Sequence, residues 1–173
     1  MRLDPFCLET TMPQTPARKN DAVDLLDADH IAVSKLFAVY RRLCDQDAPS
    51  DEKQDVAEQI CEELTIHAQL EEEIFYPQVR EAINCDDLLD EAEVEHGTAK
   101  DLITQISNMS PDDDLYDARV KVLGEYIDHH VNEEREGIFL KARKSRLDLL
   151  AIADELSERK RELMDEYRAE QVG

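Results

Sequence analysis

Two segments of the chain repeat a histidine that is followed four residues later by a glutamate. The pairs are His67 with Glu71 and His130 with Glu134. Positions four apart lie one above the other on an α-helix, so both side chains of each pair project from the same face. Imidazole binds iron, zinc, copper and nickel, while carboxylate prefers harder ions and can bridge two of them. The chemistry that this spacing indicates is metal coordination.

Two further histidines, His30 and His96, lie on apolar stripes of predicted helices. A buried carboxylate without a partner is costly, and its pKa rises until it is neutral, so a metal would satisfy this set of side chains. Four histidines and two glutamates exceed the needs of one tetrahedral zinc. They fit a dinuclear site in which both glutamates bridge the two ions. The predicted metal ligands are His30, His67, Glu71, His96, His130 and Glu134.

A count of coordination positions indicates reactivity at such a site. Two octahedral ions offer about twelve positions, and this ligand set with one bridging oxygen species leaves about two of them open. Open positions would receive O2, peroxide or another small ligand.

Other interpretations of the same residues are available. A single histidine on an apolar stripe is usually a core residue, and one His-x-x-x-Glu pair is often a surface ion pair. A ferritin-like carboxylate site would use two Glu-x-x-His motifs, and the chain holds one in Glu93 and His96. A bundle without metal would leave Glu71 and Glu134 unexplained. Four inward histidines, two of them with a glutamate four residues later, favour the metal hypothesis.

Several polar side chains flank the predicted ligands. His129 is rotated by about 100° from His130, so we expect it at the surface or in outer contact with the site. Tyr126 lies one turn before His130, where it either hydrogen-bonds near the metals or packs in the core. The acidic neighbours are predicted to form a solvated helix face. They are Glu72, Glu73, Glu133 and Glu136.

Helices must position these side chains. The chain has 173 residues, with 4 Gly, 6 Pro and no Trp, a composition that favours one helical domain. Apolar residues recur with helical period over five stretches, and Pro77 is expected to end or kink the second. The stretches are 21–47, 51–83, 86–109, 115–144 and about 148–168. Short connections predict an all-α fold, an antiparallel up-down-up-down four-helix bundle with an additional C-terminal helix.

The domain organisation follows from the same patterns. Residues 1–20 show no sustained period and are predicted to be a flexible leader. Residues 21–145 would form the bundle, and residues 146–173 the C-terminal helix and tail.

Charge and composition exclude several classes of function. The net charge of −22 would repel nucleic acid and anionic membranes, so no nucleic-acid or membrane partner is expected. The sequence shows no apolar run of transmembrane length and no signal peptide, which predicts a cytoplasmic protein. No CxxC pair is present, and reduced thiols are expected. The cysteines are Cys7, Cys44, Cys61 and Cys85.

The motifs resemble the hemerythrin-like HHE cation-binding family over about residues 20–145. The segments that show the resemblance are DLLDADH (24–30), HAQLEEEIFYP (67–77), VEHGTAKDLI (94–103) and YIDHHVNEEREGIF (126–139). The resemblance implies a four-helix bundle with a non-haem di-iron centre, two Fe ions with an oxo or hydroxo bridge. The same six residues would be its ligands.

One position departs from the oxygen-carrying members of that family. They have a fifth histidine ligand one turn after the third-helix histidine, where this chain has Lys100. Lys100 either hydrogen-bonds a bound oxygen species or extends to solvent. The chain is similar to four-histidine HHE proteins, which implies binding of, or reaction with, O2 or peroxide, with a catalase-like or oxidative-stress role. The alternative is an iron or oxygen sensor or buffer without turnover.

Overall fold

The computed structural model describes residues 19–172, so residues 1–18 of the predicted leader lie outside the described part. Every regular element within residues 19–172 is helical, which confirms the all-α prediction. The elements are α1 (Ala22–Asp45), α2 (Ser50–Leu70), the π-helix η1 (Glu71–Phe75), α3 (Tyr76–Ala82), α4 (Asp86–Ser107), α5 (Tyr116–Glu136), α6 (Ile138–Lys144) and α7 (Leu149–Val172).

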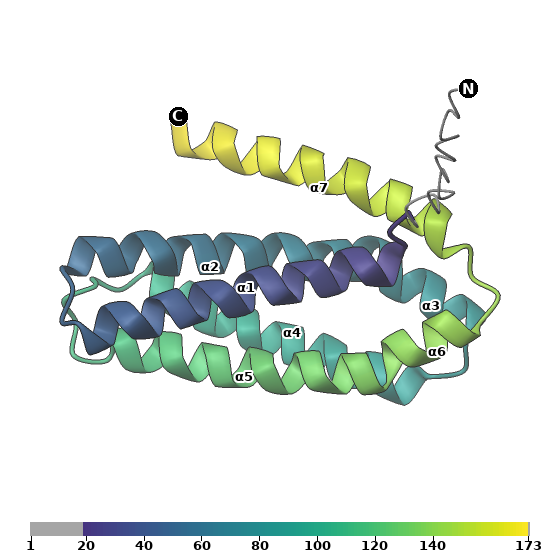
Figure 1. Cartoon of the computed structure of the whole chain (residues 1–173), viewed down its shortest axis with the longest axis horizontal. Helices are drawn as coiled ribbons and strands as arrows, with labels where there is room; N and C mark the ends of the chain where they lie inside the picture. Colours follow the sequence, from purple (N-terminus) through teal and green to yellow (C-terminus); the bar gives the residue numbers. More distant parts are fainter. Residues whose placement is uncertain (1–18, 173) are drawn as a thin grey trace, which may run out of the picture.

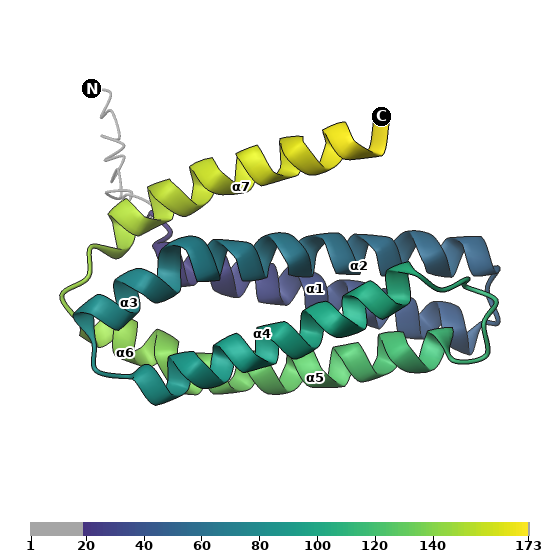
Figure 2. The ribbon, with the colours of Figure 1, turned by 180° about the vertical axis from the view of Figure 1, so that it is seen from behind.

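The long helices α1, α2, α4 and α5 lie side by side with short connections, and their directions alternate along the chain (Figure 1). Helices α3 and α6 extend α2 and α5 at the same end of the molecule. Helix α7 lies outside this group, alongside α1 and α2, and Figure 2 shows the same arrangement from behind. None of the helices described between residues 19 and 172 is long and apolar enough to cross a membrane.

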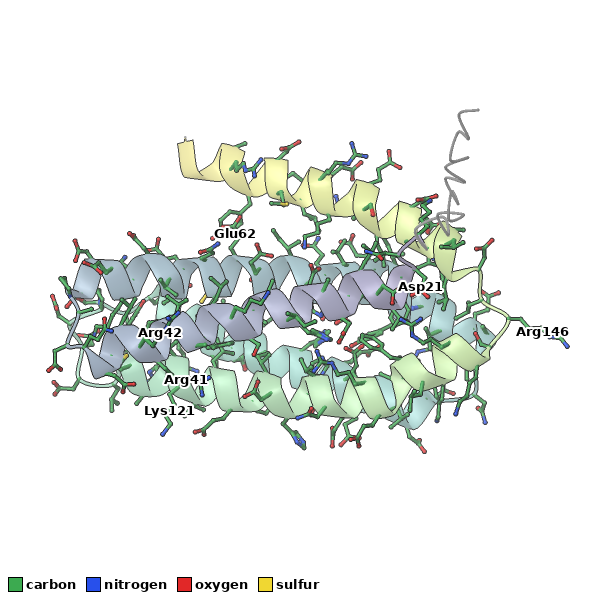
Figure 3. The ribbon with its side chains drawn as sticks, in the orientation of Figure 1. Asp21, Arg41, Arg42, Glu62, Lys121 and Arg146 are labelled. Carbon is green, nitrogen blue, oxygen red and sulfur yellow. The ribbon has the colours of Figure 1, made fainter. Side chains whose placement is uncertain are left out.

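Charged side chains cover the outer helix faces, among them Arg42 of α1, Glu62 of α2 and Lys121 of α5 (Figure 3). The buried residues form two apolar clusters. One contains Leu26, Leu70 and Ile138, and the other contains Val33 and Leu123. The four histidines on the apolar stripes lie along the helices between the two clusters.

The start of α1 is fixed by a capping box. Asp21 accepts a hydrogen bond from the Asp24 backbone N–H at 3.0 Å, and the Asp21 N–H donates to Asp24 at 3.1 Å. Arg143 of α6 donates to both carboxylates, at 2.7 Å and 2.6 Å. Helix α1 is thus joined at this end to α6, which extends α5.

The helix predicted over 51–83 is interrupted but not ended near Pro77. Proline has no N–H and its ring clashes with the carbonyl of the residue four positions earlier, here Glu73. The chain forms the π-helix η1 immediately before Pro77, with the Tyr76 N–H donating to the Glu71 carbonyl, and helix continues to Ala82. Of the two expected effects of Pro77, the structure shows an interruption of the regular helix and not its end.

The helix predicted over 115–144 divides at Gly137 into α5 and α6. A Cβ at Gly137 would meet the Glu133 carbonyl oxygen at 2.9 Å and Leu88 at 3.1 Å. A Cβ at Gly97 in α4 meets nothing within 4 Å. Close approach of the backbone therefore requires glycine at position 137 and not at position 97.

These two glycines give a matched pair of substitutions. Gly137→Ala should lower the free energy of unfolding by about 1–3 kcal/mol, because backbone atoms must move. Gly97→Ala should raise it by about 0.5–1 kcal/mol, because alanine favours helix. Urea denaturation of the metal-free proteins measures both. Equal effects of the two substitutions would show that Gly137 is not held by close packing.

Candidate metal centre

The structure brings all six predicted ligands together in the interior. Glu71 is 0% exposed and Glu134 2%, and the four histidines are 4–5% exposed. Their nitrogen and oxygen atoms form two groups in which all donor atoms lie within 4.8 Å of one another. The first cluster contains His30, His67, Glu71 and Glu134, and the second contains Glu71, His96 and His130.

In each cluster two histidines from different helices converge. The Nε2 atoms of His30 and His67 lie 2.8 Å apart in the first cluster, and those of His96 and His130 lie 3.2 Å apart in the second. Two imidazole nitrogens aimed at one point are arranged as ligands of one ion. Each of the helices α1, α2, α4 and α5 supplies one of these histidines.

Glu71 belongs to both clusters. Its Oε1 lies 3.2 Å from His67 Nε2, and its Oε2 lies 3.3 Å from His96 Nε2. Glu134 approaches only the first cluster, with Oε2 3.4 Å from His30 Nε2. Glu71 thus contacts a histidine of each cluster, whereas Glu134 lies within 4 Å of a histidine in the first cluster only.

Tyr76 is a member of the site that the sequence analysis missed. Its side chain is fully buried, and its hydroxyl lies 3.1 Å from Glu134 Oε1, 3.3 Å from Glu71 Oε2 and 3.4 Å from His96 Nε2. In a regular helix Tyr76 would point about 140° away from Glu71, since residues five apart are not on one face. The π-helix η1 brings the two side chains together. The neighbouring Pro77 was the available signal in the sequence.

Acidic side chains contact the outer nitrogens of the second cluster. His96 Nδ1 lies 3.0 Å from Glu72, and His130 Nδ1 lies 2.7 Å from Glu95. A carboxylate only accepts, so Nδ1–H donates in both bonds and Nε2 keeps its lone pair for a metal. Glu72, predicted to lie on a solvated face, is partly exposed, but its contact with His96 was not predicted, and Glu95 was missed.

The first cluster has acids at longer range. His30 Nδ1 lies 3.9 Å from Asp27, and His67 Nδ1 lies 3.7 Å from Asp29. These distances exceed a hydrogen bond, although the carboxylates still favour a proton on Nδ1. We call Asp27, Asp29, Glu72 and Glu95 the outer acids.

The remaining flanking residues lie outside the clusters. His129 is exposed, with Nε2 3.3 Å from Glu133, which is exposed as well. Tyr126 packs against the apolar cluster that contains Val33, which favours the core interpretation. Lys100 is half-exposed and pairs with Glu72 at 2.6 Å instead of facing the six residues. Glu93, considered for a ferritin-like site, pairs with Arg80 at the surface.

The side chains present fit a metal. Four buried polar atoms of the first cluster make no hydrogen bond to any part of the chain that the structure describes. Two are the Nδ1 atoms that face Asp27 and Asp29, and the other two are Glu71 Oε1 and Glu134 Oε2. Buried carboxylate oxygens without donors are costly, and cations would satisfy them. Nitrogen and carboxylate donors together suit first-row transition metals.

A comparison with protein families decides what this arrangement is. The family model described as hemerythrin HHE cation-binding domain matches residues 21–142. The chain belongs to this hemerythrin family. The match includes all six residues of the two clusters and ends before α7.

Two similar proteins add to the comparison. A hemerythrin HHE cation-binding-domain-containing protein from Mycobacterium kansasii shares the fold, with a TM-score of 0.67 at 17% identity over 84% of this chain and 88% of that one. A protein of Nostoc sp. described as a DNA nickase is 31% identical over 125 residues. The alignment covers 70% of this chain and 33% of the nickase, so the chain spans about a third of the length of this relative.

In the hemerythrin domain, the pKa values of the two buried glutamates shift in opposite directions. Burial and the neighbouring Glu71 raise the pKa of Glu134 well above its ordinary value. Burial also acts to raise the pKa of Glu71, but His67 and His96 outweigh it and hold that pKa well below its ordinary value. Two close carboxylates cannot both ionise freely, so the metal-free centre favours a proton on Glu134 over one on Glu71.

The two histidines of the first cluster differ in the same way. Burial and the charge of His67 lower the pKa of His30 from 6.5 to about 2. Burial opposes the charge on His67 too, but Glu71 and Asp29 outweigh it and raise its pKa from 6.5 to about 10. The metal-free protein at neutral pH therefore holds a proton on His67.

Metal binding is expected to release protons and to strengthen as the pH rises. A metal takes the lone pair of His67 and the charge of Glu134, so the metal-free form binds more protons than the metal-bound form. By linkage, affinity should increase with pH up to about 10, because below that pH the metal must displace a proton from His67. Calorimetry in buffers of different ionisation enthalpy measures the release. Binding heats that do not depend on the buffer would contradict this proton assignment.

Proposed function

We propose that this hemerythrin domain holds two iron ions, one in each cluster, and that it binds or reacts with O2 or peroxide. The supporting observation is the pairing of histidine nitrogens at 2.8 Å and 3.2 Å around a shared Glu71. His30, His67 and Glu134 would bind one ion, and His96 and His130 the other. Glu71 would bind both. Bound iron would supply electron exchange with an oxygen ligand.

The chain supplies the surroundings that such chemistry needs. Phe139 stacks on His30 with ring centroids 5.7 Å apart, and Phe75 packs on Phe139, so one wall of the centre is apolar. Tyr76 places a hydroxyl proton beside both glutamates. A narrow cleft of about 10 Å³ between α4 and α5 reaches His130 and Glu134, and it would admit about one water-sized molecule.

Further parts of this proposal concern the whole chain. We infer that the helices form the up-down-up-down bundle expected from the sequence, with α7 appended. The net charge of −22 opposes DNA binding, and the match covers only a third of the nickase, so we do not extend nicking to this chain. A cytoplasmic location is part of the proposal.

A second function, iron or oxygen sensing or buffering without turnover, uses the same ligands. The observation that favours it is the depth of the centre, since both glutamates are at most 2% exposed and the cleft is narrow. Slow exchange of ligands would suit a buffer better than a catalyst.

Metal analysis and peroxide consumption test the proposal together. Protein loaded anaerobically with ferrous iron should hold about two irons per chain, one for each cluster. Added peroxide should change the absorption spectrum. Evolved oxygen in the steady state supports turnover, whereas a single spectral change without turnover supports the sensor or buffer. His67→Ala should lose iron, and the exposed His129→Ala should retain it. Bound zinc alone, or no metal, would contradict the proposal.

A further inference from the structure

Asp29 contacts both a predicted ligand and the C-terminal helix. Its Oδ2 faces His67 Nδ1 at 3.7 Å, and its Oδ1 accepts a hydrogen bond from Lys160 of α7 at 2.6 Å. The Asp29 side chain is 19% exposed and that of Lys160 is 27% exposed, so water screens the pair only in part.

Each of the other outer acids also faces a cationic or ionisable side chain. Arg135 donates to Asp27 at 2.5 Å, and Lys100 donates to Glu72 at 2.6 Å. The arrangement of a histidine, a carboxylate and a cationic side chain therefore recurs around the centre. The fourth outer acid, Glu95, faces the exposed His129 at 3.9 Å.

Helix α7 differs from the other helices that supply these cationic side chains. Arg135 and Lys100 lie on the helices that bear His130 and His96, whereas α7 lies outside the family match at residues 21–142. A second ion pair joins α7 to the same region, because Arg159 donates to Glu73 of the π-helix η1 at 2.8 Å. The helix therefore contacts α1 beside His30 and the turn that carries Glu71.

We propose that α7 supplies a positioning residue to the metal centre, in which Lys160 holds Asp29 against His67 and thereby strengthens metal binding in the first cluster. The proposal rests on the two-metal function proposed above. At 3.7 Å the charge of Asp29 favours a proton on His67 Nδ1, which leaves Nε2 for the metal. Without Lys160, the Asp29 carboxylate is free to turn toward water, away from His67.

Anaerobic titration of the full chain with ferrous iron, followed by calorimetry, tests the proposal. Removing the direct acidic partner of a ligand histidine typically weakens metal binding by about 10- to 100-fold. Asp29→Asn should weaken one of the two binding steps by this amount, and Lys160→Met should weaken the same step by about tenfold. Lys160→Arg should restore it. In the Asp29→Asn background, Lys160→Met should have no further effect, because Lys160 acts through Asp29.

An equivalent variant at the second cluster distinguishes positioning from a general loss of stability. Lys100→Gln removes the partner of Glu72, which contacts His96, so it should weaken the other binding step. Arg161→Gln removes an exposed charge from α7, and Asp154→Asn breaks a surface ion pair of α7 with Lys19. Both controls should leave the two steps unchanged.

Four results are decisive. A loss confined to one step, shared by Asp29→Asn and Lys160→Met, supports the positioning role. Equal weakening of both steps by Lys160→Met and Asp154→Asn would overturn it, because docking of α7 alone would then matter. Unchanged binding in Lys160→Met would also overturn it while the two-metal function stands. If the parent protein binds no iron, the proposed function itself fails.

Discussion

Glu71→Gln should remove both metal ions, whereas Glu134→Gln should remove only one. The two oxygens of Glu71 lie 3.2 Å and 3.3 Å from histidines of different clusters. Glu134 reaches a histidine of the first cluster alone. An amide keeps the shape of the side chain but loses the charge and one oxygen ligand. The iron content of the anaerobically loaded proteins, measured by elemental analysis, gives the comparison.

Thermal unfolding provides a second measurement of the same effect. A ligand present at about a thousand times its dissociation constant adds about 4 kcal/mol to stability when it binds only the folded state. This iron-dependent gain should vanish in Glu71→Gln and persist in part in Glu134→Gln. Glu133→Gln is the matched control, since this exposed neighbour faces His129. If Glu71→Gln keeps one ion, Glu71 does not serve both clusters.

Tyr76→Phe is expected to weaken the second cluster and to alter the colour of the ferric protein. That cluster has three candidate ligands where the first has four, and the Tyr76 hydroxyl is 3.4 Å from His96 Nε2. Loss of this group should reduce metal affinity there by about 10- to 100-fold, as for other groups that support metal ligands. If the phenolate binds ferric iron, its charge-transfer absorption in the visible range should disappear with the hydroxyl.

Tyr126→Phe is the control for this substitution, because Tyr126 packs against an apolar cluster that contains none of the six residues. A fall in affinity without a change in colour would assign Tyr76 a hydrogen-bonding role toward Glu71 and Glu134. Unchanged affinity and colour would reduce Tyr76 to a space-filling side chain. Binding of the phenolate to iron would have to displace the phenol proton, since burial and both glutamates raise the pKa of Tyr76 well above its ordinary value.

The sequence by itself predicted the helices and the inward direction of the six side chains. Hydrophobic periodicity gives the face of a helix, and a spacing of four places two residues on it, so His67 with Glu71 and His130 with Glu134 could be paired without coordinates. The family motifs extend over the same residues. The same periodicity predicted the start of α1 near residue 21.

Only the tertiary structure decided what surrounds those six residues. Periodicity assumes a regular α-helix, and the π-helix before Pro77 breaks that assumption. The apolar pattern therefore did not predict that Tyr76 turns inward. Asp29, Glu72 and Glu95 each lie near a histidine of another helix. Asp27 lies near His30 of its own helix, at a spacing of three residues that also occurs on exposed helix faces. Asp29 and Lys160 are 131 residues apart in sequence. Contacts between distant segments depend on how helices pack, and a pattern within one helix does not contain that information.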